Sequence, residues 1–114
     1  MIKDIEDNLR VFVTYVKNNM KGYEKGEAQL FLERLFQSFG NEGILEAGAS
    51  LEAQVKIDIT TKFCDLLWPE KVLIEMKSSK EKNLAVHFTQ AKNYWNELYD
   101  DQTDYVILCN FDEF

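Results

Sequence analysis

The first half of the chain has the apolar spacing of helices. Apolar residues recur every three or four positions over residues 2–20, and again over residues 27–39. Residues at this spacing lie on one side of an α-helix. We therefore predict two helices, separated by a break that contains Gly22 and Gly26. Gly40 suits the end of the second helix, because glycine readily adopts the left-handed conformation found after many helices.

In the second half of the chain the apolar period shortens to two. Residues 55–60 alternate between apolar and polar side chains, which is typical of a half-buried strand. Residues 63–68 and 72–78 are two further strand candidates, and Pro69 between them favours a turn. Residues 41–54 combine glycines with a stretch that could form a helical turn, so the pattern leaves their structure open.

The last part of the chain predicts a helix and a buried strand. Asn83 can cap a helix whose apolar positions extend to Leu98. Residues 105–111 are apolar except for Asn110, as expected when both faces of a strand are covered. The predicted order is two helices, three strands, a helix and a strand. This order gives an α/β fold with a mixed sheet flanked by helices, and the length suits one domain, residues 1–114.

Two acidic residues, Asp65 and Glu75, interrupt apolar strand candidates. A buried carboxylate is costly unless it has a cation or several hydrogen-bond donors. Glu75 and Lys77 share a strand face, because side chains alternate along a strand. Asp65 lies opposite Glu75 if Trp68 pairs with Val72 across a three-residue loop, with the β-carbons about 4.5–5.5 Å apart. A two-residue loop would put the two acids on opposite faces.

Two carboxylates at that separation repel each other, and one takes up a proton unless a cation lies between them. Mg²⁺ suits the arrangement, because it is typically held by one or two carboxylates, several waters and a substrate phosphate. Such an ion can generate a hydroxide nucleophile, and Lys77 could orient the water or neutralise the transition state. The pattern thus favours phosphodiester hydrolysis. The alternative is a structural ion pair between Lys77 and Asp65 or Glu75.

The spacing of these residues resembles a known signature. Asp65, nine further residues and Glu75-Met76-Lys77 resemble the motif of the PD-(D/E)xK nuclease superfamily, although Cys64 precedes Asp65 where the name of the superfamily has proline. Gln90 and Tyr94 resemble the Gln-x-x-x-Tyr motif found in part of that superfamily. More narrowly, five stretches resemble the N-terminal endonuclease domain of single-chain type IIG and type IIL restriction-modification enzymes: residues 26–28, 45–49, 72–78, 90–95 and 105–111.

This resemblance implies a restriction-endonuclease-like αβββαβ core and Mg²⁺-dependent cleavage of DNA, with Mn²⁺ as a substitute. It implies that Asp65 and Glu75 are metal ligands and that Lys77 is the catalytic lysine. Gln90 and Tyr94 would position substrate or water. The alternative for this pair is a simple surface contact, because residues four apart are neighbours on a helix.

Three other residues have two interpretations each. Glu27 could be a third metal ligand, or it could stabilise the start of its helix through the helix dipole. Asp58 is a rival to Asp65, but it lies on the polar phase of its strand, which a solvated face explains. His87, the only histidine, is interpreted as a helix-face residue rather than a catalytic one.

The charge bears on how DNA is held. The chain has 13 basic and 20 acidic residues, a net charge of −7, whereas domains that grip DNA alone are usually basic. The resemblance implies that the chain is an N-terminal fragment. A methyltransferase domain using S-adenosylmethionine and a target-recognition domain would follow it and hold the DNA. The rival hypotheses are an inert interaction module of the same fold and a repair or junction nuclease.

The two cysteines, Cys64 and Cys109, lie in apolar strand candidates. We interpret them as free buried thiols, which suits the reducing cytoplasm. No apolar run approaches the ~18 residues of a membrane span, so we expect no membrane partner.

Overall fold

A four-stranded mixed sheet forms the centre of the fold in the computed structural model, which describes residues 2–57, 60–98 and 102–114. The strands are β1 (Ser50–Ile57), β2 (Thr60–Trp68), β3 (Val72–Met76) and β4 (Tyr105–Cys109), and they lie side by side in that order. β1 is antiparallel to β2 and β2 is antiparallel to β3, whereas β4 is parallel to β3. The predicted fold class, a mixed sheet flanked by helices, is confirmed.

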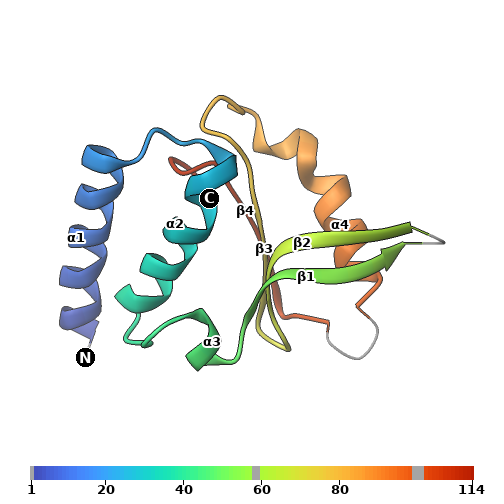
Figure 1. Ribbon diagram of the computed structural model, residues 1–114, viewed down its shortest axis with the longest axis horizontal. Coiled ribbons are helices and arrows are strands. Elements are labelled where there is room, and N and C mark those ends of the chain that lie inside the picture. The colour runs from blue at the N-terminus through green and yellow to red at the C-terminus, as the bar shows by residue number, and fades with distance from the viewer. Residues whose placement is uncertain (1, 58–59, 99–101) are drawn as a thin grey trace.

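Helices lie on both sides of the sheet (Figure 1). α1 (Ile2–Asn19), α2 (Glu24–Ser38) and the short α3 (Ile44–Ala47) lie on one side, and a 3-10 turn, η1 (Leu84–His87), leads into α4 (Phe88–Asn96) on the other. Each side has its own apolar cluster. The larger cluster surrounds Phe31 and Leu32 of α2 and includes Leu66, Ile74 and Met76. The smaller cluster joins α4 to the sheet through Val55, Cys64, Leu67, Leu73, Tyr94 and Leu98.

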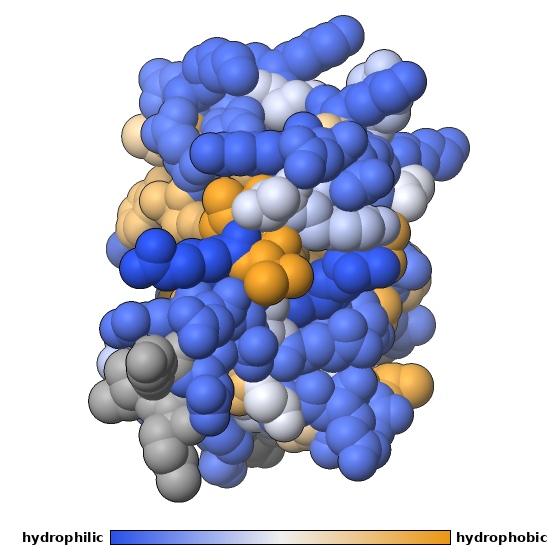
Figure 2. Space-filling view, turned by 90° about the vertical axis from the view of Figure 1, so that its left-hand side faces the viewer, coloured by the Kyte–Doolittle hydropathy of each residue, from blue (hydrophilic) through white to orange (hydrophobic). Residues whose placement is uncertain are grey.

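α1 packs through the stripe that the sequence predicts. Phe12 and Val16 are buried in the larger cluster, whereas Val11 and Val13 are exposed. The outer face of the helix is mostly hydrophilic, with apolar side chains in a small area near its middle (Figure 2). No helix among the described residues is both long and apolar enough to cross a membrane.

The hairpin between β2 and β3 has the predicted length. Trp68 pairs with Val72, Leu67 with Leu73 and Leu66 with Ile74. The loop therefore contains three residues, and Lys71 N–H donates to Trp68 O at 2.9 Å. The next pair in this register places Asp65 opposite Glu75, as the longer of the two possible loops predicts.

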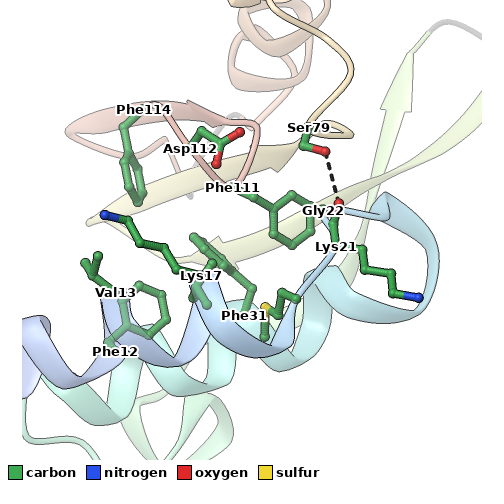
Figure 3. A pocket seen from close by; sticks show the side chains of 12 residues that line it. Phe12, Val13, Lys17, Lys21, Gly22, Phe31, Ser79, Phe111, Asp112 and Phe114 are labelled. Atoms are coloured by element: carbon green, nitrogen blue, oxygen red, sulfur yellow. Dashed lines mark hydrogen bonds between the residues drawn. The ribbon is translucent and has the colours of Figure 1, made fainter.

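A close contact at Gly22 joins the segment after β3 to the loop between α1 and α2 (Figure 3). Ser79 N–H donates to Gly22 O at 2.9 Å, and Ser79 Oγ donates to Lys21 O at 3.2 Å. Gly22 has φ of 82°, and a Cβ there would clash with Ser79 Oγ. Beside this contact lies a cavity of about 360 Å³, with Phe12, Phe31 and Phe111 among its lining residues. The contact fixes the segment that follows Lys77 against the start of α2.

Three predictions about the elements need correction. Residues 41–54, which the sequence left open, contain α3 and the start of β1. β1 begins at Ser50 rather than at residue 55, because Gly48, with φ of 94°, ends α3 and directs the chain into the sheet. Asn83 makes no side-chain cap, and the helix starts as a 3-10 turn. β4 is not covered on both faces, since Tyr105 is 71% exposed and the strand lies at the edge of the sheet.

Of two further predictions, one concerns a residue that the structure does not describe and the other is confirmed. Asp58 lies outside the described residues. Cys64 and Cys109 are free and buried, as predicted, and burial raises their pKa values to about 12 and about 11. Thiols with such pKa values stay protonated at neutral pH, as is usual for buried cysteines.

Candidate active site

Asp65 and Glu75 are joined across the β2–β3 hairpin by two hydrogen bonds. The backbone N–H of Asp65 donates to Glu75 Oε1 at 2.9 Å, and the N–H of Met76 donates to Asp65 Oδ2 at 2.6 Å. Each carboxylate thus accepts a bond from the backbone of the other strand. The structure therefore brings together the two acids that the sequence singled out.

The regular alternation of β2 breaks at this point. Leu66 packs in the larger cluster, whereas Cys64, two residues earlier, packs in the smaller one on the other side of the sheet. Residues two apart in a regular strand share a face, so the strand changes its facing at Asp65. Opposite Asp65 on β1 lies Glu52, between the pairs Leu51–Leu66 and Ala53–Cys64, with φ of 54°. Strained residues of this kind gather at functional sites.

Burial makes the two carboxylates weak acids. Glu75 is 4% exposed, and burial together with the nearby charge of Asp65 raises its pKa to about 8. Burial also raises the pKa of Asp65, although the hydrogen bond from Met76 acts in the opposite direction. A glutamate with a pKa of about 8 is mostly protonated at neutral pH unless a cation lies beside it.

Lys77 follows the last residue of β3 and lies beside the pair. Its backbone N–H donates to Cys109 O at 2.7 Å, and its ammonium donates to Gln90 Oε1 at 3.0 Å. Its positive charge lowers the pKa values of both Asp65 and Glu75, although burial outweighs it. Within the described residues Lys77 forms no ion pair with either acid. The alternative of a structural ion pair is therefore not what the structure shows.

Gln90 and Tyr94 extend the site onto α4. The amide Nε2 of Gln90 donates to the hydroxyl of Tyr94 at 3.2 Å. Tyr94 is 5% exposed, and burial followed by the charge of Glu75 raises its pKa. Because Gln90 also accepts a hydrogen bond from Lys77 and Tyr94 is buried, the pair is joined to Lys77 and is more than a contact between surface side chains.

Glu27 is placed differently from the acid pair. Its carboxylate accepts hydrogen bonds from the backbone N–H groups of Lys21 and Tyr23, with Oε1 at 2.8 Å from Tyr23 N. The bond from Tyr23 is the largest cause of its lowered pKa. Both oxygens have donors, so the side chain stabilises the loop that leads into α2. This position matches the structural interpretation of Glu27.

Two acids that sequence reasoning missed lie near Asp65. Glu24 and Glu52 line, together with Asp65, a cavity of about 290 Å³ between α2 and the sheet. The charges of both add to the raised pKa of Asp65, whose main cause is burial. No sequence pattern marked them, because both are exposed acids among many others. His87 contacts Glu81 at 3.3 Å, in line with its interpretation as a helix-face residue.

The acid pair fits a divalent cation held by two carboxylates. Within the described ranges, Asp65 Oδ1 and Glu75 Oε2 have no hydrogen-bond partner, so one oxygen of each acid is available. Asp65 also lines the open cavity. The part of the chain that the structure describes contains no group of three or more His, Cys, Asp or Glu placed to hold a metal ion. The fit is thus to Mg²⁺ with most of its shell supplied by waters and substrate, which is usual for this ion.

The fold and this site define a class. A mixed sheet in αβββαβ order, with two acids across the β2–β3 hairpin and a lysine two residues after the second acid, is a restriction-endonuclease-like core. The family model described as "MmeI, N-terminal domain" matches residues 4–114. The chain belongs to this family, the N-terminal domain of a type IIG restriction enzyme, as the sequence resemblance indicated. No curated protein and no solved structure matches the chain.

Proposed function

We propose that this chain is the Mg²⁺-dependent endonuclease domain of a single-chain, type IIG- or IIL-like restriction-modification enzyme, and that Mn²⁺ can replace Mg²⁺. The observation that carries the proposal is the pairing of the half-buried Asp65 with the buried Glu75, each with one available oxygen, beside an ammonium that neither of them neutralises. Membership of a restriction-enzyme family supports the choice of DNA as the substrate.

Each residue has one task in this proposal. Asp65 and Glu75 would hold the ion, and the Glu75 carboxyl would lose its proton when the ion is bound. When bound, the ion would supply a Lewis acid and would lower the pKa of the attacking water. The Lys77 ammonium orients that water and stabilises the charge that develops on the phosphate oxygens. The backbone bonds from Asp65 and Met76 keep both carboxylates in position while the proton leaves.

We further propose that domains outside these 114 residues hold most of the DNA. The net charge of −7 opposes a phosphate backbone. Methyltransferase and target-recognition domains in the same polypeptide would supply the grip, and S-adenosylmethionine would be used there. The acidic site itself attracts Mg²⁺ because it raises the local negative potential.

The test is cleavage of plasmid DNA by the full-length enzyme carrying Asp65→Asn or Glu75→Gln. Both variants keep the shape of the side chain and remove the charge. We expect cleavage to fall on the order of 100-fold or more, as when a group that stabilises transition-state charge is lost. DNA binding in a mobility-shift assay should be unchanged. Glu6→Gln is the matched control, because Glu6 is an exposed acid on α1.

Mg²⁺-dependent cleavage at the wild-type rate by either variant would contradict the assignment. A wild-type enzyme that binds DNA and Mg²⁺ but cuts no DNA would support the inert interaction module instead. Glu27→Gln in the same assay decides between the two interpretations of that residue. Cleavage within a few-fold of wild type supports its structural role, and a loss as large as that of Glu75→Gln supports a third metal ligand.

A further inference from the structure

The orientation of the Gln90 amide is determined by its two partners. An ammonium can only donate hydrogen bonds, so the atom of Gln90 that faces Lys77 must be Oε1. The other end of the amide, Nε2, then faces Tyr94 and donates to its hydroxyl. Only this orientation of the amide satisfies both hydrogen bonds. Lys77 donates to Gln90, and Gln90 donates to Tyr94.

Tyr94 anchors this chain of hydrogen bonds in the interior. Its side chain is packed in the smaller apolar cluster, between α4 and the sheet. Gln90, in contrast, is an exposed side chain on the first turn of α4. An exposed glutamine has many rotamers of similar energy, and a hydrogen bond to a buried hydroxyl selects among them. The buried tyrosine thereby fixes the position of the amide oxygen that the lysine needs.

The partner of Lys77 is neutral although two acids lie close by. A flexible ammonium beside two carboxylates would ordinarily pair with one of them, and it would then occupy an oxygen that a metal ion needs. In this structure Asp65 Oδ1 and Glu75 Oε2 are available, while the ammonium is held by Gln90. The amide thus keeps the lysine close to the acids without neutralising them.

We propose that Gln90 and Tyr94 are positioning residues that hold the Lys77 ammonium in its catalytic place and away from the metal-binding oxygens. This inference rests on the proposed function, in which Lys77 acts on the attacking water. It differs from direct substrate positioning by Gln90 and Tyr94, because their effect on the reaction passes through Lys77.

The test measures single-turnover cleavage by the full-length enzyme and DNA binding with Ca²⁺ in place of Mg²⁺. We expect Gln90→Ala to slow cleavage roughly 10- to 100-fold, the range for a misplaced catalytic group. Tyr94→Phe keeps the packed ring and removes the hydroxyl, so its effect should be smaller but in the same direction. DNA binding should not change in either variant. Gln37→Ala and Tyr105→Phe are matched controls, since both residues are exposed and lie on other elements.

Two variants separate positioning from direct contact with DNA. Gln90→Glu keeps an oxygen acceptor for Lys77, and Tyr94 can then donate to it, so cleavage should be faster than in Gln90→Ala. A carboxylate that touched a phosphate would repel it, so cleavage slower than in Gln90→Ala would contradict the proposal. In a Lys77→Met background, Gln90→Ala should cause little further loss, because residues that act as a unit are not additive. A full additional loss, or weaker DNA binding, would also contradict it.

The outcomes distinguish this inference from the proposed function. If Lys77→Met abolishes cleavage and Gln90→Ala retains the wild-type rate, the positioning role alone is wrong. If the wild-type enzyme does not cleave DNA, or if Lys77→Met leaves cleavage unchanged, the proposed function is wrong and the inference fails with it. Thermal unfolding of each variant in the full-length enzyme shows whether a slower rate merely reflects loss of folded protein.

Discussion

Glu27 and Glu75 are both glutamates with hydrogen bonds to backbone N–H groups, yet the fold treats them in opposite ways. Glu27 receives donors on both oxygens, and the bond from Tyr23 is the main cause of its lowered pKa. Glu75 receives one donor and is buried next to another acid, and its pKa rises to about 8. An acid whose bonding is complete stabilises the fold. An acid that is buried with an oxygen to spare can bind a cation, and it belongs to the candidate site.

This contrast predicts opposite signs for two chemically identical substitutions at pH 8 without metal. The pKa of Glu75 is raised above its unfolded value near 4.5, so the stability it contributes is present below that value and is lost as pH rises towards about 8. Glu75→Gln should therefore raise the free energy of unfolding at pH 8, by on the order of a few kcal/mol. The pKa of Glu27 is lowered, so its contribution is present above its unfolded value and is lost at acidic pH. Glu27→Gln should lower stability at pH 8.

Urea unfolding of the two variants and wild type at pH 5 and pH 8 measures these effects. Wild type should lose stability between the two pH values, and Glu75→Gln should lose less. Adding Mg²⁺ at pH 8 should recover stability in wild type and not in Glu75→Gln, because a ligand that binds the folded state stabilises it. Destabilisation by both substitutions at pH 8 would remove the distinction between the two glutamates.

A smaller effect is expected at the two glycines that flank the loop bonded by Glu27. Gly22→Ala should destabilise the protein through two causes, a positive φ and a clash with Ser79, whereas Gly26→Ala meets the positive φ alone. The positive φ costs about 1–2 kcal/mol at either position. Gly22→Ala should therefore have the lower midpoint in urea unfolding. Equal midpoints would show that Ser79 moves to make room for the new Cβ with no loss of stability. The contact would then not fix the segment after Lys77.

Much of the site could be read from the sequence because it depends on local geometry. The pairing of Asp65 with Glu75 follows from the register that the three-residue turn at Pro69 sets, and this register is local. The start of β1 could not be read, because it depends on the conformations of Gly48 and Glu52 within the folded chain. Burial of β4 was also predicted wrongly. An apolar strand shows which residues can be buried, whereas its place at the edge of the sheet decides how many are.

Glu27, the possible third metal ligand, also shows what apolar spacing in the sequence cannot predict. Glu27 attracted attention because it opens the predicted helix, but its carboxylate faces the backbone of Lys21 and Tyr23. Glu24, three residues earlier, lines the cavity with Asp65. Non-helical backbone at Lys25 and Gly26 separates the two glutamates. The apolar spacing of the sequence, which predicts a regular helix, gives no sign of this break. Sequence periodicity therefore located the pair of strand acids, and it did not locate the acids that surround them.

The central claim is that the Glu75 carboxyl, beside Asp65, carries a proton at neutral pH that a divalent ion displaces. Isothermal titration calorimetry of the full-length enzyme with Mn²⁺ at pH 7, in buffers of different ionisation enthalpy, measures the protons released on binding. We predict release of about one proton per ion by wild type, since a metal binds the deprotonated ligands. The release should vanish in Glu75→Gln and persist in Glu27→Gln. Binding by wild type without proton release, or equal release by Glu75→Gln, would contradict the account.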